Sequence, residues 1–220
     1  CMTKSKILTT TNANSNFELF ETMLWEPKKG VFLSNFHFSR LRNSAVYFGF
    51  NWNSAKIKIK LEEYLKGCHS EPMKIKLFLS SNGSIRISNS VLTSKEQKKN
   101  YSISLAKEPI DQQDVFYYHK TTKREIYEQA KPINPDSDDV LFWNEAGEIT
   151  ESKIANIIIN IDGEWYTPPI ISGLLGGTYR QMMIESQLLK ERVIHKSEII
   201  NLTEITLINS VRGKFKAKLI

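Results

Sequence analysis

Hydrophobic and polar positions alternate in the first part of the chain in a way that predicts two hairpins. Residues 17–25 alternate as a strand does, and 31–33 is expected to return as the partner strand after a turn that contains Pro and Gly. Residues 73–79 alternate again before an Asn-Gly pair at 82–83, which is typical of a tight hairpin turn, and the apolar pattern resumes at Ile85.

Between these hairpins, apolar residues recur at helical spacing. From Ser34 onward one face of a helix is predicted to pack inward, and Arg40 lies off this apolar stripe. The stripe consists of Phe38, Leu41, Ala45 and Phe48. Residues 56–61 alternate as a strand would, but the following residues, 62–65, are typical of a helix. We favour a helix over both segments.

The second half of the chain also mixes strands and helices. A strand is predicted over 115–118, followed by a helix over 122–130 that stops at Pro132. Another helix is expected to begin near Thr178, after three glycines, and to run to Lys190. Further strands are predicted over 140–143, 154–159 and 205–208.

Residues 107–114 are polar, contain a proline and separate two strand-rich halves, so we place the domain boundary there. The chain is thus expected to consist of a loose N-terminal segment, 1–16, a small α+β domain, 17–110, and a larger α+β domain, 111–220. Regular alternation of strands and helices is missing. This absence favours two α+β domains over a doubly wound sheet.

The composition is that of an ordinary globular protein, with 220 residues, 40% of them hydrophobic and 25% charged. The longest apolar runs fall far short of the roughly 20 residues that span a bilayer, so no transmembrane helix is expected. The polar sequence after Met2 lacks the apolar stretch of a secretory signal. The net charge of +6 favours nucleic acid or small anionic ligands as partners, although a solvated lysine-rich surface would give the same charge.

Cysteine and histidine usage argues against two kinds of chemistry. Apart from Cys1, which precedes Met2, the chain contains only Cys68. An intramolecular disulfide is therefore not expected, and a reducing cytosol is favoured. The four histidines are scattered and lack the paired spacing of a zinc site, so no metal is expected.

Four features combine residue types that can carry chemistry. Lys120 lies where a predicted strand gives way to a helix, and a nucleophilic lysine must be partly deprotonated by burial or nearby positive charge. Glu151 is followed by small and apolar residues, and a buried carboxylate needs a cationic partner. The glycine-rich segment 172–180 opens a helix, as phosphate sites do, and 209–213 brings Arg212 after a strand. Each feature alone also fits a surface residue or a tight loop.

Taken in order, these motifs resemble the fold-type IV (class IV) enzymes that depend on pyridoxal 5'-phosphate (PLP), from about Phe17 to the C-terminus. The motifs are FET at 20–22, SRL at 39–41, KTT at 120–122, NE at 144–145, TE at 150–151, AN at 155–156, and TPP at 167–169 with the glycine loop. Within the family the resemblance is closest to 4-amino-4-deoxychorismate lyase, particularly in 21–27, 118–122 and 209–213. The implied fold is the two-domain α+β fold of D-amino-acid aminotransferase.

The resemblance, carried over residue by residue, implies a PLP site in the second domain. Lys120 would form the Schiff base with the cofactor and act as the base, while Glu151 would keep the pyridine nitrogen protonated. Thr22 would lie close to the reacting centre. Arg212 is a candidate for binding a substrate carboxylate. The groups implied to hold the cofactor phosphate are Arg40, the backbone N–H groups of Thr178 and Tyr179, and Ser210.

The resemblance also implies an activity, the conversion of 4-amino-4-deoxychorismate to 4-aminobenzoate and pyruvate, a step towards folate. It implies a homodimer, a small anionic substrate and a functional link to aminodeoxychorismate synthase. Two alternatives remain open: a class IV aminotransferase acting on branched-chain or D-amino acids, and a non-catalytic basic binding protein. The lysines are spread over many segments without a nucleic-acid-binding signature, so neither nucleic acid nor a membrane is an expected partner.

Overall fold

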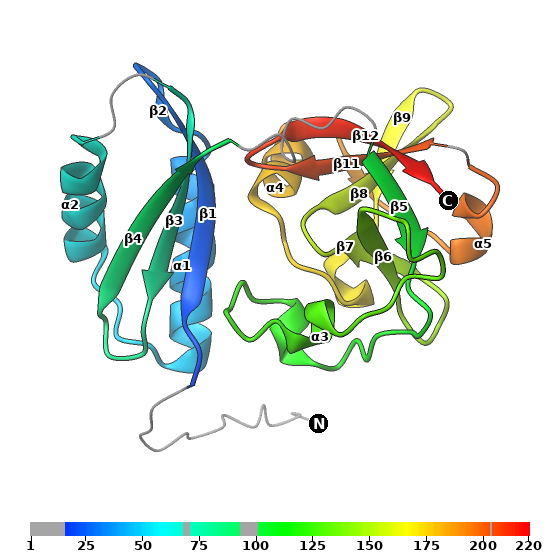
Figure 1. Ribbon diagram of the computed structural model, residues 1–220, viewed down its shortest axis with the longest axis horizontal. Helices are drawn as coiled ribbons and strands as arrows, with labels where there is room; N and C mark the ends of the chain where they lie inside the picture. Colours follow the sequence, from blue (N-terminus) through cyan, green and yellow to red (C-terminus); the bar gives the residue numbers. More distant parts are fainter. Residues whose placement is uncertain (1–15, 68–70, 93–100, 203) are drawn as a thin grey trace, which may run out of the picture.

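The computed structural model describes residues 16–67, 71–92, 101–202 and 204–220, which form two β-sheets lying side by side (Figure 1). The predicted loose segment, 1–16, lies outside these residues except for Asn16, and so does Cys68. No helix among the described residues is long and apolar enough to cross a membrane.

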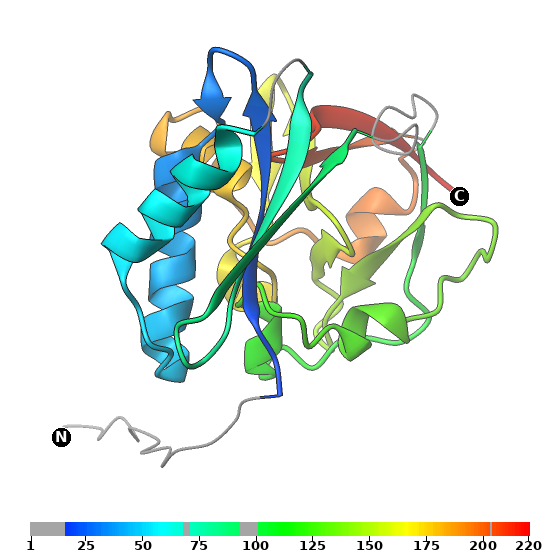
Figure 2. The same ribbon diagram turned by 60° about the vertical axis from the view of Figure 1, so that its left-hand side comes forward.

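The smaller sheet is antiparallel, with the strand order β2-β1-β3-β4. Its elements are β1 (Leu19–Glu26), β2 (Gly30–Val31), β3 (Met73–Leu79), β4 (Ile85–Val91), α1 (Ser34–Phe48) and α2 (Ser54–Leu65). Both predicted hairpins and both predicted helices are confirmed. The helices cover one face of the sheet (Figure 2), where alternate residues of β1 and β3 such as Met23 and Ile75 join Leu41 and Ile57 in one core.

The alternating pattern at the start of α2 is explained by its position at the surface. Ile57 and Leu61, four residues apart, are buried against the sheet, whereas Ile59 between them is 54% exposed. Residues four apart share a helix face, so two of the three apolar residues are enough to anchor it. The helix starts where the side chain of Asn53 accepts a hydrogen bond from Lys56 N at 2.9 Å.

The larger sheet has the strand order β10-β9-β8-β11-β12-β5-β6-β7, and β7 also pairs with β8. This second pairing closes β5, β6, β7, β8, β11 and β12 into a barrel. The strands are β5 (Tyr101–Leu105), β6 (Asp139–Trp143), β7 (Ile149–Ser152), β8 (Asn156–Ile161), β9 (Glu164–Thr167), β10 (Lys190–Glu191), β11 (Glu204–Asn209) and β12 (Gly213–Leu219). Apolar side chains such as Ile103, Leu141, Ile157 and Leu207 fill one buried core of this sheet.

The helices of the larger part are short. They are the 3-10 helices η1 (Val115–Tyr117) and η2 (Ile170–Ser172) and the α-helices α3 (Glu125–Glu128), α4 (Thr178–Glu185) and α5 (Lys196–Ile199). The strand predicted over 115–118 is wrong, because the Asp114 side chain accepts a hydrogen bond from Phe116 N and starts a helical turn instead. The helix predicted over 122–130 shortens to α3, and the helix at Thr178 ends five residues early.

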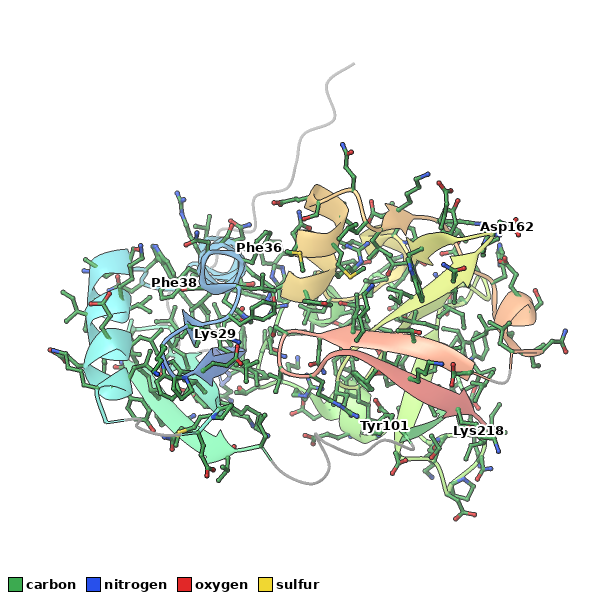
Figure 3. The ribbon with its side chains drawn as sticks, turned by 90° about the horizontal axis from the view of Figure 1, so that it is seen from above. Lys29, Phe36, Phe38, Tyr101, Asp162 and Lys218 are labelled. Atoms are coloured by element: carbon green, nitrogen blue, oxygen red, sulfur yellow. The ribbon has the colours of Figure 1, made fainter. Side chains whose placement is uncertain are left out.

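The two sheets divide the chain between β4 and β5, so the predicted boundary at 107–114 lies too late along the chain. β5 belongs to the larger sheet because it pairs in parallel with β12 and β6. Seen from above (Figure 3), Phe36 and Phe38 of α1 lie in the smaller part, and Tyr101 and Lys218 lie in the larger part. Helices α1 and α4 contact each other across the junction.

Candidate active site

A cavity of about 510 Å³ lies between the two sheets, and residues of both line it. On the smaller sheet it meets the face that the helices do not cover, with Phe20 and Thr22 from β1 and Lys74 and Lys76 from β3. Its wall carries seven Lys or Arg side chains but only two carboxylates, those of Glu128 and Glu151. The cavity therefore suits an anionic ligand.

Lys120 enters this cavity from the segment between η1 and α3. Its carbonyl oxygen accepts a hydrogen bond from Phe20 N at 3.0 Å, which fixes its backbone against β1. Its Nζ lies 4.6 Å from the centre of the Phe20 ring. Burial and the positive charges of Arg40 and Arg124 lower the pKa of Lys120 to about 7. A large fraction of the amine is therefore neutral and nucleophilic near neutral pH.

Glu151, on β7, is 5% exposed and lies on the same wall. Its Oε1 accepts hydrogen bonds from the Tyr127 hydroxyl at 2.9 Å and from Leu175 N at 3.0 Å, and its Oε2 accepts one from Asn156 Nδ2 at 3.3 Å. Burial raises the pKa of Glu151 to about 7. Among the described residues no cation forms an ion pair with Glu151, so a cationic group bound in the cavity would find an oriented carboxylate.

The N-terminus of α4 closes another side of the cavity, through Gly177 and Thr178. The first N–H groups of a helix have no partner within the helix and favour anions such as phosphate. A Cβ at Gly177 would lie 2.0 Å from Oδ1 of Asn156, so only glycine allows this close approach of the loop to β8. Arg40 is tied to the same loop, because its Nη1 donates to Gly176 O at 3.1 Å.

A buried polar cluster behind Arg40 was not predicted. Glu21 accepts hydrogen bonds from Arg40, and its Oε2 lies 2.7 Å from Nδ1 of the fully buried His37. Nε2 of His37 lies 3.4 Å from Oγ1 of Thr178. Burial by itself would raise the pKa of Glu21, but Arg40 and His37 lower that pKa to about 2. Burial lowers the pKa of His37. Glu21 is thus an anion that orients Arg40 and joins β1 to α1, while His37 links α1 to α4.

The remaining predicted residues lie on the turn between β11 and β12 and on β1. Ser210 Oγ donates to the backbone oxygen of Thr22 at 3.3 Å, which joins the two parts of the chain at the cavity wall. The guanidinium carbon of Arg212 lies 3.6 Å from the centre of the Phe215 ring and 4.8 Å from that of Tyr101.

Seven of the eight predicted site residues therefore line one cavity. They are Thr22, Arg40, Lys120, Glu151, Thr178, Ser210 and Arg212. The eighth, Tyr179, was predicted through its backbone N–H in the first turn of α4, and its ring lies 6.0 Å from that of Phe32. Sequence reasoning missed the supporting residues Glu21, His37, Tyr127 and Asn156. Of these, Glu21 and Asn156 carried a signal, because they belong to the FET and AN motifs, although neither was given a role.

The donor and acceptor groups of the cavity match the chemical groups of PLP. Lys120 offers an amine to its aldehyde, and Glu151 offers an unpaired carboxylate to its pyridine nitrogen. The start of α4, with Arg40 beside it, offers N–H donors to its phosphate. The close approach at Gly177 packs the loop before α4 against Asn156 of β8.

Comparisons with known proteins agree with this arrangement. Residues 18–220 match the family described as Amino-transferase class IV. A Schizosaccharomyces pombe protein named "Putative aminodeoxychorismate lyase" is 30% identical over 211 residues, which cover 92% of this chain and 89% of the relative.

Solved structures share the fold. A "Putative amino-acid aminotransferase" from Mesorhizobium loti is similar with a TM-score of 0.83 and 31% identity, covering 93% of this chain and 100% of that one. A "Putative 4-amino-4-deoxychorismate lyase" from Legionella pneumophila is similar with a TM-score of 0.80 and 22% identity, covering 92% and 82% of the two chains. The predicted fold class is confirmed, and the chain belongs to the class IV aminotransferase family, whose enzymes depend in general on PLP.

Proposed function

We propose that the protein is a PLP-dependent lyase that converts 4-amino-4-deoxychorismate to 4-aminobenzoate and pyruvate. The main observation is the pairing, in one cationic cavity, of a lysine whose pKa is about 7 with an oriented, buried glutamate. The substrate carries two carboxylates, which suits a wall with seven basic side chains and two acidic ones. The name of the 30% identical relative supports the same reaction.

The residues of the cavity divide the chemistry among them. PLP, when bound, withdraws electrons from the carbon that carries the substrate nitrogen. Lys120 is placed to remove the proton from that carbon, because with a pKa of about 7 roughly half of its amine is neutral near pH 7. Glu151 keeps a proton on the pyridine nitrogen, held in place by Tyr127 and Leu175 N. Arg40 and the first turn of α4 hold the phosphate end.

Loss of the enolpyruvyl group completes the reaction. The C–O bond to the ring breaks, the ring becomes aromatic, and the departing enolate takes up a proton to become pyruvate. Lys120, which has just gained a proton, and the Thr22 hydroxyl both line the cavity and both can supply it. Aromatisation makes the elimination effectively irreversible.

The experiment that tests this function follows both products in the same sample. Purified protein with PLP and enzymatically generated 4-amino-4-deoxychorismate should release 4-aminobenzoate and pyruvate in equal amounts. Lys120→Ala should abolish both products and the borohydride-reducible adduct with PLP. Lys123→Ala is the matched control, because Lys123 is exposed, lies outside the cavity wall and should leave turnover intact.

An aminotransferase is the second candidate, and the Mesorhizobium loti structure, at 31% identity, carries that name. It would use Lys120 and Glu151 in the same way but would return the proton to the cofactor and require a 2-oxo acid. Product formation that depends strictly on an added 2-oxo acid would replace the lyase with this function.

By the same resemblance we propose that the enzyme acts as a homodimer in the cytosol, in a step towards folate. Light scattering of the purified full chain checks the dimer.

A further inference from the structure

Arg124 lies on the cavity wall four residues after Lys120, and the proposed function gives it no role. The side chain is half-buried. Its Nη2 donates to the backbone oxygen of Lys153 at 2.7 Å, and its guanidinium carbon lies 4.5 Å from the centre of the Tyr127 ring. The hydroxyl of Tyr127 in turn donates to Glu151. Arg124 is thus connected to Glu151 through Tyr127, and its charge acts on both Lys120 and Glu151.

Only a small part of the hydrogen-bonding capacity of Arg124 is used. A guanidinium has five N–H donors in a rigid fork, and one hydrogen bond of this side chain is seen among the described residues. In the described part of the chain, no nitrogen of Arg124 is both buried and without a hydrogen-bond partner. The Nε atom of Arg180, by contrast, is buried without one. Because Arg124 lines the cavity, its remaining donors are available to a ligand there.

The two other arginines of the wall are placed differently. Arg40 directs Nε and Nη2 to Glu21 and Nη1 to Gly176 O. Arg212 has buried Nε and Nη1 atoms, and its guanidinium lies over the ring of Phe215. Arg124, with one hydrogen bond to Lys153 O, is therefore less engaged by protein groups than Arg40.

We propose that Arg124 binds an anionic oxygen of the ligand beside Lys120, either the ring carboxylate of the substrate, which 4-aminobenzoate retains, or the phenolate oxygen of the cofactor. Both are oxyanions that match the planar fork of a guanidinium. The stacking on Tyr127 and the bond to Lys153 O fix the orientation of this fork, so little side-chain freedom is lost on binding. The substrate alternative rests on the proposed function, whereas the cofactor alternative requires only PLP binding.

The charge of Arg124 also affects the pKa values of Lys120 and Glu151. After burial and Arg40, Arg124 is the next cause that lowers the pKa of Lys120, and it also lowers that of Glu151 against the larger effect of burial. An oxyanion bound to Arg124 would offset this positive charge and raise the proton affinity of Lys120 once the ligand is in place. Arg124 therefore couples ligand binding to the protonation of the proposed base.

The experiment measures ligand dissociation constants of the PLP-loaded protein by calorimetry, so that the result does not depend on turnover. The probes are 4-aminobenzoate and its neutral analogue 4-aminobenzamide, and the Kd for PLP is measured separately. If Arg124 binds a substrate carboxylate, Arg124→Gln should weaken 4-aminobenzoate about tenfold or more while 4-aminobenzamide changes less than about twofold. If it binds the phenolate, the variant should weaken PLP about tenfold and shift the pH titration of its absorbance.

Two further variants complete the test. Arg124→Lys keeps the charge but loses the fork and should recover only part of the affinity. Arg42→Gln is the matched control, because Arg42 is an exposed arginine of α1 outside the cavity wall, and it should change none of these values. Unchanged constants for both ligands in a folded Arg124→Gln protein would overturn the inference. Absence of pyruvate release by the wild type would refute the proposed lyase but leave these binding constants to decide the role of Arg124.

Discussion

Both carboxylate oxygens of Glu21 accept hydrogen bonds from Arg40, from Nε at 2.9 Å and from Nη2 at 2.5 Å. This two-point contact joins β1 to α1, and the third nitrogen of Arg40 reaches Gly176 O in the loop before α4. The arginine expected to hold phosphate is thus positioned by a buried glutamate of the smaller sheet.

Glu21→Gln should destabilise the protein and loosen its hold on PLP. The variant removes the charge that pairs with Arg40 while leaving that cation partly buried, which costs about 3 kcal/mol of unfolding free energy. The Kd for PLP should rise about tenfold, because Arg40 loses its orientation. Urea unfolding and PLP titration measure the two effects. Glu26→Gln, in an exposed pair with Lys29, should change stability by less than about 0.5 kcal/mol.

Gly177→Ala should impair the start of α4. The new Cβ would lie 2.0 Å from Oδ1 of Asn156, so either the loop or Asn156 must move. We expect a loss of about 2 kcal/mol in stability and a clear drop in PLP affinity. Gly67→Ala is the matched control, since its Cβ would have only an ordinary contact, 3.5 Å from Tyr64 O. Equal behaviour of the two variants would show that the close approach at Gly177 has no importance.

The free energy of unfolding of the cofactor-free protein should depend on pH through the titration of Lys120. Its pKa is 10.5 in the unfolded reference and about 7 in the folded protein, so the folded protein releases this proton first. The contribution of Lys120 to unfolding free energy is therefore lowest below pH 7 and rises as the pH increases from 7 to 10.5. Lys120→Met should be more stable than the wild type by about 2 kcal/mol at pH 6, after allowance for partial exposure, and this difference should narrow by pH 9. Urea unfolding at both pH values tests it, and parallel curves for the two proteins would contradict it.

The Thr22→Val variant tests whether Thr22 or Lys120 protonates the departing enolpyruvate. Valine keeps the shape and removes the hydroxyl, and Thr22 lies on the cavity wall. If the hydroxyl supplies the proton, kcat for pyruvate release should fall about tenfold or more with little change in KM, and Thr22→Ser should restore it. An unchanged kcat in the valine variant assigns this step to Lys120.

Local sequence patterns were sufficient to predict the two hairpins and the two helices of the smaller part, but not the β1–β3 pairing that joins the hairpins into one sheet. The two hairpins are short-range, and the helices have apolar stripes such as Leu41 and Ala45 that bury one face. The same reasoning failed where pairing is long-range. β5 is a strand because its neighbours are β12 and β6, which lie far along the sequence, and nothing within residues 101–105 indicates which sheet they join.

For the candidate site too, sequence motifs identified some of the residues, whereas the role of others could be found only from the fold. Lys120 and Glu151 belong to motifs, so resemblance selected them, and burial explains their shifted pKa values only once the fold is known. His37 gave no signal, because a histidine inside an amphipathic helix is common. Its importance arises from Glu21 on one side and Thr178 on the other, 16 and 141 residues away in the sequence.

The segment that carries Lys120 is attached directly to the first strand of the chain. Phe20 N donates to Lys120 O, Thr122 N donates to Glu18 O at 2.8 Å, and Glu18 N donates to Thr122 Oγ1 at 2.8 Å. The two halves of this protein are therefore not exchangeable modules. A chimera that takes its N-terminal half from another family member must transplant residues 18–20 and 120–122 together, since any offset between them would displace the reactive amine.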